Sequence, residues 1–172
     1  MPNSTRRDVK NHDAAANLAT VVAAKKKEKD NAWYDYEVYH AYVCQPKRSF
    51  GLVRHIAFQF KGEIQETVPT ILGEPEDVTF ELGRYNGRIG ELVEQMLANN
   101  ARQVGAIHRV FLLSAPDALE TVKLGGTIKI DKRDKNGRPI PFTYGGNRYV
   151  KLAELLRVAV LPQSERVTSQ LK

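Results

Sequence analysis

The residues best suited to chemistry lie where a glycine-rich turn joins a short apolar strand to a helix. The turn runs from Gly83 to Gly90 and carries Arg84 and Arg88, and residues 78–82 before it predict a strand. Backbone amides at the start of a helix attract anions, and an arginine fork adds charged donors for phosphate oxygens. The spacing matches neither GxGxxG nor GxxxxGK[ST]. The turn therefore predicts a phosphate contact, with the alternative that its glycines serve only a tight turn and close packing.

A second cationic segment is the predicted hairpin at residues 129–138, in which Asn136-Gly137 is a strong signal for a two-residue turn. Its basic residues are Lys129, Lys132, Arg133, Lys135 and Arg138. Such a finger can lie along a nucleic-acid backbone as a less specific contact, and its affinity should fall steeply with salt. The alternative is a solvated hairpin whose charges prevent edge pairing. Lys47 and Arg48, in a basic loop, complete the candidate nucleic-acid contacts.

Aromatic side chains would supply the other half of a nucleic-acid surface, because bases stack on them. Residues 31–44 are dense in aromatics, and their alternation predicts a strand that places Tyr34, Tyr36 and Tyr42 on one face. The candidates for base stacking are Trp33, Tyr34, Tyr36 and Tyr85. Ordinary packing inside a sheet is the alternative for each of them.

Residues for catalysis or metal binding are sparse. The four histidines show no HxxxH or HExxH spacing, and a single cysteine, Cys44, excludes both an intrachain disulfide and a Cys-based zinc site. We therefore predict no catalytic residue, no metal and no cofactor. The alternative is a Mg²⁺-dependent nuclease of the PD-(D/E)xK type, which needs carboxylates on adjacent strands. Glu63-Ile64-Gln65 would be a degenerate version of its last element.

A sheet built around residues 52–72 must position these side chains. Ile56, Phe58 and Phe60 alternate with polar or small neighbours, and Lys61-Gly62 predicts the turn of a hairpin. Helices are expected over 13–29, 89–97 and 149–159, and further strands over 106–113 and 127–130. Strands and helices are grouped rather than strictly alternating. This order predicts an α+β fold with a curved, mainly antiparallel, barrel-like sheet and flanking helices.

The domain organisation follows from composition. Residues 1–30 are predicted to be a basic N-terminal arm with a helix that the core does not need, because the segment has a basic run but only a thin apolar stripe. Residues 31–162 should form a single α+β domain, and residues 163–172 a polar tail.

Three strings of residues resemble the layout of PUA-like domains, especially the EVE branch. They are Phe58 to Ile71, Arg109-Val110-Phe111-Leu112-Leu113 and Gly146-Asn147-Arg148-Tyr149-Val150, and the resemblance covers roughly residues 33–160. It implies a curved, barrel-like sheet with flanking helices that holds a pocket for a modified base. The related YTH readers use an aromatic cage that includes tryptophan, and this chain has only Trp33. Plain nucleic-acid binding is therefore the inference that we carry forward.

The charge balance gives the partner class. The formal net charge is +6 and the isoelectric point about 9.4, which favours anionic partners, nucleic acid first. No apolar leader or membrane-spanning stretch is present, so we expect a cytoplasmic protein without a membrane partner. The prediction is a non-catalytic nucleic-acid-binding or nucleotide-sensing module, such as a subunit of a larger nucleic-acid-processing or defence complex, with DNA and RNA both open. The alternatives are the nuclease and a structural subunit that binds other proteins.

Overall fold

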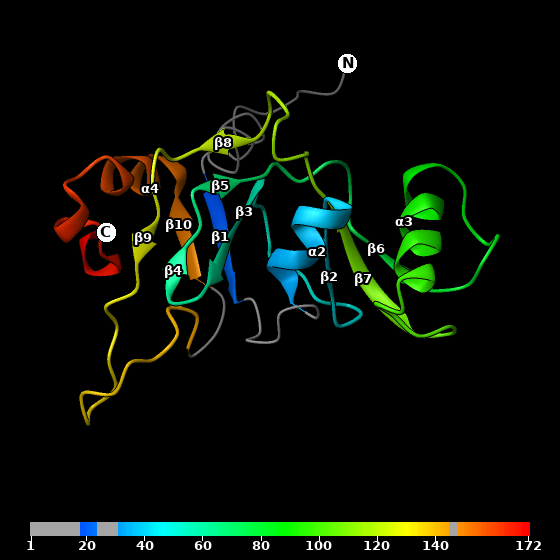
Figure 1. Cartoon of the computed structure of the whole chain (residues 1–172), viewed down its shortest axis with the longest axis horizontal. Helices are drawn as coiled ribbons and strands as arrows, with labels where there is room; N and C mark the ends of the chain where they lie inside the picture. The colour runs from blue at the N-terminus through cyan, green and yellow to red at the C-terminus, as the bar shows by residue number, and fades with distance from the viewer. Residues whose placement is uncertain (1–17, 24–30, 145–147) are drawn as a thin grey trace, which may run out of the picture.

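The computed structural model describes residues 18–23, 31–144 and 148–172 (Figure 1). Its helices are α2 (Ala32–Tyr39), α3 (Gly87–Ala98) and α4 (Leu152–Ala159), followed by the short 3-10 turns Gln163–Glu165 and Thr168–Gln170. Its strands are β1 (Leu18–Ala23), β2 (Ala41–Cys44), β3 (His55–Phe60), β4 (Glu63–Ile64), β5 (Thr67–Val68), β6 (Glu76–Thr79), β7 (Ile107–Leu112), β8 (Val122–Lys123), β9 (Ile128–Lys129) and β10 (Arg148–Lys151).

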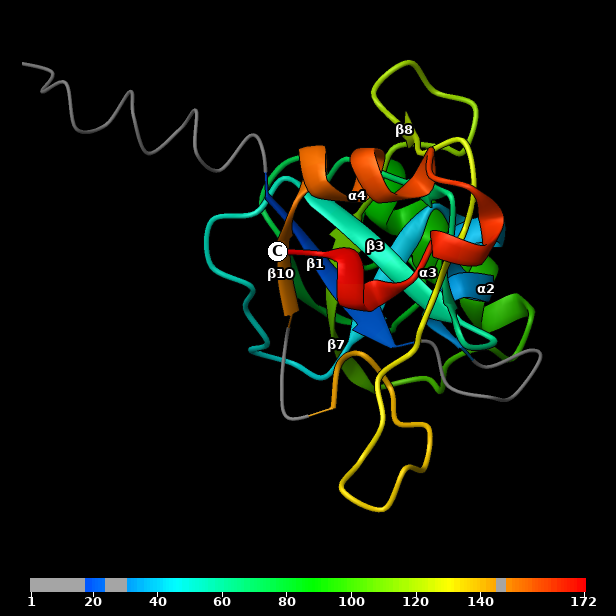
Figure 2. The ribbon, with the colours of Figure 1, turned by 90° about the vertical axis from the view of Figure 1, so that its left-hand side faces the viewer.

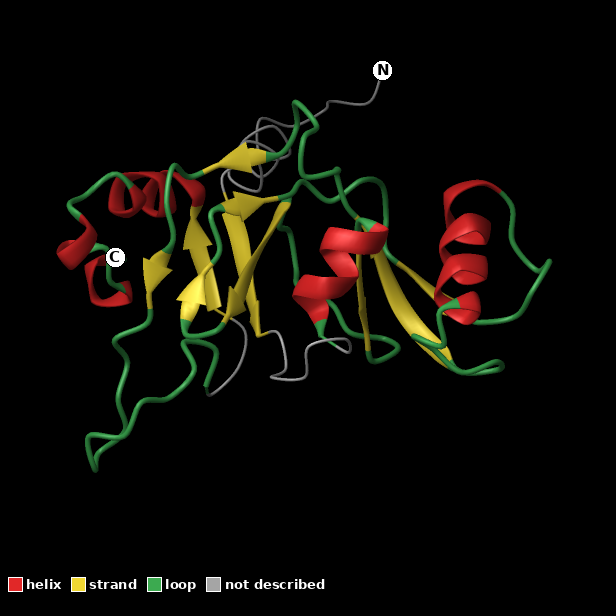
Figure 3. Ribbon diagram, in the orientation of Figure 1, coloured by secondary structure: helices red, strands yellow, loops and turns green. Residues whose placement is uncertain are grey.

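The strands form one curled sheet of five strands and two smaller sheets. The five-stranded sheet has the order β10-β1-β3-β4-β9, and only β1 and β3 within it are parallel. The second sheet, β2-β7-β6, and the pair β5-β8 are antiparallel. This arrangement confirms the predicted α+β fold with a curved, mainly antiparallel, half-barrel sheet and flanking helices (Figure 3).

The hairpin predicted around residues 52–72 lies at the centre of the five-stranded sheet. Strands β3 and β4 pair with Phe60 opposite Glu63, and the turn between them is Lys61-Gly62. Both turn residues have positive φ, +49° and +82°, which matches the twist of an antiparallel hairpin. Ile56, Ala57 and Phe58 in β3 are completely buried, so both faces of this strand contribute to the core.

Three hydrophobic clusters hold the layers together. One face of the five-stranded sheet packs against α4, through residues that include Val21, Ile128 and Leu155. The opposite face packs against α2 and the second sheet around Phe58. A third cluster joins the second sheet to α3. Helix α3 therefore lies at one end of the long axis and α4 at the other, with α2 between them (Figure 1).

Two of the predicted elements are wrong. The helix expected over 13–29 is contradicted at Leu18–Ala23, which form β1 between β10 and β3. The core therefore needs this part of the arm, and the rest of the predicted helix lies outside the described residues. The aromatic strand expected over 31–44 is instead helix α2 followed by β2, with His40 in the left-handed conformation between them (φ +50°). Asn31 begins the helix by accepting a hydrogen bond from the Tyr34 amide (2.8 Å).

The C-terminal segments also pack more closely than predicted. The helix expected over 149–159 is divided between β10 and α4. The segment expected to be a polar tail, residues 163–172, returns to the sheet: Val167 bridges Lys129 of β9, Thr168 is buried and Leu171 contacts the α4 cluster. The predicted helix at 89–97 and the strands at 78–82, 106–113 and 127–130 correspond to α3, β6, β7 and β9, with shifted ends.

Candidate nucleic-acid interface

The hairpin at residues 129–138, here called the cationic finger, projects from the sheet below β9 (Figures 1 and 2). Its tip is closed by hydrogen bonds from the Asp134 amide to the Arg138 carbonyl (2.9 Å) and from the Gly137 amide to the Asp134 carbonyl (3.0 Å). Gly137 has φ +76°, which glycine adopts without strain. The Asp134 carboxylate also accepts from the Asn136 and Arg138 amides. The finger therefore has a defined tip.

The carboxylates of the finger are already engaged by neutral donors. Asp134 is held by the amides of the tip, and Asp131 accepts hydrogen bonds from the Thr168 hydroxyl (2.7 Å) and the Ser169 amide (2.9 Å). Partial burial alone would raise the pKa of Asp131, but the donors from Ser169 and Thr168 outweigh it and lower that pKa. Asp131 is therefore an anion at neutral pH whose oxygens are turned toward the C-terminal segment.

The basic side chains of the finger stay available to an external anion. Lys129, Lys135 and Arg138 are exposed. Lys132 donates to the Tyr144 carbonyl (3.1 Å) and Arg133 to the Gly137 carbonyl (2.8 Å), so both have neutral partners. Within the described residues, no basic side chain of the finger is ion-paired with a carboxylate. The prediction that these five residues contact nucleic acid therefore stays a prediction, and the structure shows that none of them first has to leave a carboxylate within the described residues.

A small hollow at the base of the finger is also lined mainly by basic side chains. Its volume is about 270 Å³, and it is lined by residues of the β3-β4 turn, β9 and the finger. The charged lining residues are Lys61, Lys129, Lys132 and Arg133 against Glu63 and Asp131. Four basic residues therefore face two carboxylates, and the lining carries a net positive charge.

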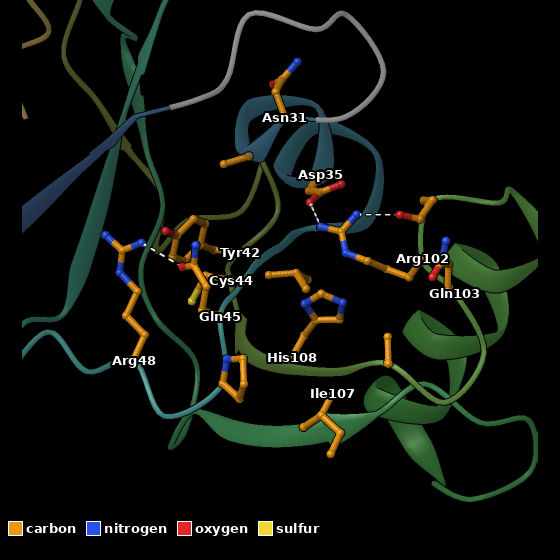
Figure 4. Close-up of a pocket in the computed structure, with 15 residues that line it drawn as sticks. Asn31, Asp35, Tyr42, Cys44, Gln45, Arg48, Arg102, Gln103, Ile107 and His108 are labelled. Carbon is orange, nitrogen blue, oxygen red and sulfur yellow. Dashed lines mark hydrogen bonds and ion pairs between the residues drawn. The ribbon is translucent and has the colours of Figure 1, made fainter.

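A second, larger pocket lies between α2, β2 and the segment that joins α3 to β7 (Figure 4). Its volume is about 540 Å³, the size of a small-molecule site. One wall holds a buried ion pair in which Arg102 contacts Asp35 at 2.6 Å and donates to the Ala101 carbonyl at 2.7 Å. At the opposite wall Arg48 donates to Gln45 (3.3 Å). The pocket therefore combines a fixed ion pair with exposed amide groups.

The ionisable groups between these walls are neutral near pH 7. Burial raises the pKa of the Cys44 thiol to about 11, and it also raises the pKa of Tyr42. Burial, assisted by the charge of Arg102, lowers the pKa of His108. Cys44 therefore remains a thiol and does not have the character of a nucleophile.

The turn predicted to bind phosphate lies at the far end of the molecule. Arg84 is paired with Glu81 (2.9 Å), and Arg88 reaches the Leu113 carbonyl (3.3 Å). Gly83 and Gly87 have positive φ, which explains their presence at the turn. A side chain at Gly90 would meet the Tyr85 carbonyl oxygen. The turn glycines thus serve conformation and packing, and the two predicted anion sites are not brought together (Figure 1).

The predicted base-stacking residues mostly belong to the core. Tyr36 has no exposed surface and stacks on Phe58 with ring centres 5.2 Å apart, so its prediction as a stacking residue is wrong. Trp33 packs on both of these rings (5.6 Å) and Tyr34 packs on Tyr39 (6.4 Å); Trp33 and Tyr34 are each half-buried.

The remaining candidates have their own local roles. The Tyr85 hydroxyl accepts from the Thr79 amide (2.9 Å), and the Lys47 amide donates to Asp77 (3.0 Å). Arg48 also lies over the Phe50 ring (5.2 Å). These contacts fix loops of the second sheet, away from the finger.

Sequence reasoning missed two exposed tyrosines that follow the finger in the chain. Tyr144 is 64% exposed and Tyr149 is 50% exposed, and the other aromatic side chains of the described residues are buried or half-buried. The short distance in sequence between Tyr144 and the basic hairpin was the available signal.

The residues of the nuclease alternative are dispersed. Glu63 pairs across the sheet with Lys129, and the Gln65 amide group donates to the Phe60 carbonyl (3.1 Å). In the portion of the chain that the structure describes, no three His, Cys, Asp or Glu side chains are grouped as a metal site.

Nor does any described helix have the length and apolar character needed to cross a membrane.

Comparisons with protein-family models, with curated proteins and with solved structures found no match.

Proposed function

We propose that this protein is a nucleic-acid-binding module without catalysis of its own, which holds the phosphate backbone of DNA or RNA on the cationic finger. The observation that carries the proposal is the state of the finger's charges: within the described residues none of its five basic side chains is ion-paired, and the carboxylates of Asp131 and Asp134 are engaged by amides and hydroxyls. The resemblance to PUA-like domains remains part of the proposal, supported by the curled half-barrel sheet.

The physical argument is counterion release. Each phosphate that a lysine or arginine neutralises frees condensed cations, and the entropy of their release drives binding. A basic residue that already has a carboxylate partner must lose that partner first, as Arg84 would lose Glu81. Within the described residues, the basic side chains of the finger have no carboxylate partner to lose before they bind a phosphate. The finger is therefore a better contact than the glycine-rich turn, which reverses the order expected from the sequence.

Nucleotide sensing in the large pocket is the second candidate. It is favoured by the pocket's volume of about 540 Å³ and by the amide groups of Gln45 and Gln103 among its lining residues. These groups can pair with the polar edge of a small planar ligand, while Tyr42 and Ile107 offer apolar contact. The two candidates are compatible, because the pocket and the finger lie on different parts of the molecule.

The test is binding of labelled single- and double-stranded DNA and RNA at two salt concentrations, together with the absorbance ratio at 260 and 280 nm of the protein as purified. We expect binding that weakens as salt rises.

Absence of salt-sensitive binding to every probe would reject the proposal and favour a structural subunit. Co-purification of a protein partner without nucleic acid is the signature of such a subunit. Cleavage of supercoiled DNA or RNA with Mg²⁺, abolished by Glu63→Ala, would favour the nuclease. A cytoplasmic location and membership of a larger nucleic-acid-processing or defence complex belong to the same proposal.

A further inference from the structure

Two exposed tyrosines follow the cationic finger in the chain, and the first of them, Tyr144, contacts the finger through its backbone carbonyl. Tyr144 lies in the turn that follows the finger, where its amide donates to the Pro141 carbonyl (3.0 Å). Tyr149 lies on β10, the last strand of the five-stranded sheet, and pairs with Thr20 of β1. With 64% and 50% of their surfaces exposed, both side chains have surface to offer a ligand. The other aromatic side chains of the described chain are buried or half-buried.

Basic side chains connect Tyr144 to the finger and to Arg148, the residue that precedes Tyr149 on β10. The Arg148 guanidinium donates to the carbonyls of Phe142 (3.2 Å) and Tyr144 (3.4 Å), so a fixed positive charge lies beside the turn that carries Tyr144. Lys132 of the finger donates to the same Tyr144 carbonyl (3.1 Å). The Tyr144 backbone therefore holds two cations at the place where its ring is exposed.

We infer that Tyr144 and Tyr149 stack against bases of a single-stranded nucleic acid whose phosphates contact Arg148 and the finger. The inference rests on the proposed function and adds the form of the nucleic acid. In a duplex the faces of the bases are covered by their neighbours, and a tyrosine on a protein surface has no base to stack on. In a single strand the faces are free, and a cationic groove with aromatic rings is the arrangement that binds such strands without strong sequence preference.

The experiment compares three ligands: a labelled 12-nucleotide single strand, the duplex of the same sequence, and a strand of equal length with abasic sites. The test variant is Tyr144→Leu/Tyr149→Val, which removes both rings while valine keeps strand propensity on β10. The matched control is Tyr144→Phe/Tyr149→Phe, which keeps both rings. Thermal unfolding of each variant confirms that the fold is intact.

We expect the ring-removing variant to bind the single strand about 5- to 100-fold more weakly for each base that stacks, and the phenylalanine variant to restore binding. Affinities for the duplex and for the abasic strand should change less than twofold between the parent and the ring-removing variant. Equal weakening for all three ligands, or no weakening for any, would overturn the inference and leave the rings as ordinary surface residues. Failure of the parent to bind any strand would instead reject the proposed function itself.

Discussion

Removal of the Asp35 carboxylate is expected to destabilise the fold by about 3–5 kcal/mol. The carboxylate lies in α2 with 2% of the residue exposed, and it contacts the Arg102 guanidinium at 2.6 Å, across 67 residues of sequence. Breaking a buried ion pair is costly because the remaining charge is left in a medium of low polarity. Arg102 keeps its hydrogen bond to the Ala101 carbonyl and 13% of its side-chain exposure. The lower end of the range is therefore expected for Asp35→Ala.

Urea unfolding measures this loss. With a slope of about 2 kcal/mol per molar urea, a loss of about 3–5 kcal/mol lowers the midpoint by about 1.5–2.5 M. The control is Glu154→Ala, which breaks a partly exposed pair with Arg157 at 2.9 Å and should lower the urea midpoint much less. The double variant Asp35→Leu/Arg102→Met should recover much of the stability, because apolar residues replace the pair. Equal midpoints for Asp35→Ala and Glu154→Ala would refute the reasoning.

Three further predictions concern stability. Asp131→Asn should destabilise the protein near pH 7 and flatten its loss of stability in acid. Folding lowers the pKa of Asp131, so the carboxylate stabilises the fold above its unfolded pKa of about 3.9, and this stabilisation disappears as pH falls through the folded value. Unfolding measured between pH 2 and 7 tests this prediction. Deleting residues 163–172 should lower the melting temperature by several degrees, because Leu171 covers the α4 cluster and the Arg166 carbonyl accepts from the Lys129 amide (2.7 Å). An unchanged melting temperature would show that this segment does not stabilise the fold. Gly90→Ala should destabilise by about 1–3 kcal/mol, since its Cβ would meet the Tyr85 carbonyl oxygen, whereas an equally stable variant would show that the turn can relax.

Local patterns predicted those elements whose signals are themselves local. The Lys61-Gly62 turn, the apolar alternation of β3 and the helical spacing in α3 each depend on neighbouring residues, and the structure has all three. The Asn-Gly pair of the finger also marks a turn, but the loop has three residues, Lys135-Asn136-Gly137, instead of the predicted two, and of these only Gly137 has positive φ. Such features can be predicted from one sequence because the geometry of the backbone and the chemistry of the turn are contained within a few residues.

Elements stabilised by distant contacts were not predictable. Strand β1 lies in an alanine- and lysine-rich segment whose overall propensity favours a helix, although Thr20, Val21 and Val22 are β-branched; its pairing with β10, about 130 residues away, and with β3 makes it a buried strand. Helix α2 buries Asp35 and Tyr39 as well as Tyr36, because it is covered from more than one side. A helix buried in this way lacks a single apolar stripe, and its alternating tyrosines imitate a strand.

In the candidate interface, too, features with local signals were predictable and features that depend on distant contacts were not. The basic residues of the finger were identified from sequence because they surround one turn. Their availability depends on Asp131 being engaged by Thr168 and Ser169, which come from a segment predicted to be a tail. Conversely, the pairing of Arg84 with Glu81 made that turn a weaker candidate than its sequence suggests.

The central claim is tested most directly by the dependence of nucleic-acid affinity on salt. Two variants remove the same number of charges: Lys135→Gln/Arg138→Gln on the finger and Arg84→Gln/Arg88→Gln at the opposite end. Each phosphate contact contributes about 0.9 to the slope of log K against log salt for duplex DNA and about 0.7 for a single strand. We predict that the finger variant lowers the slope by about 1.4–1.8 and that the other variant leaves it nearly unchanged. An unchanged slope for the finger variant, with a reduced slope for the Arg84/Arg88 variant, would contradict the account.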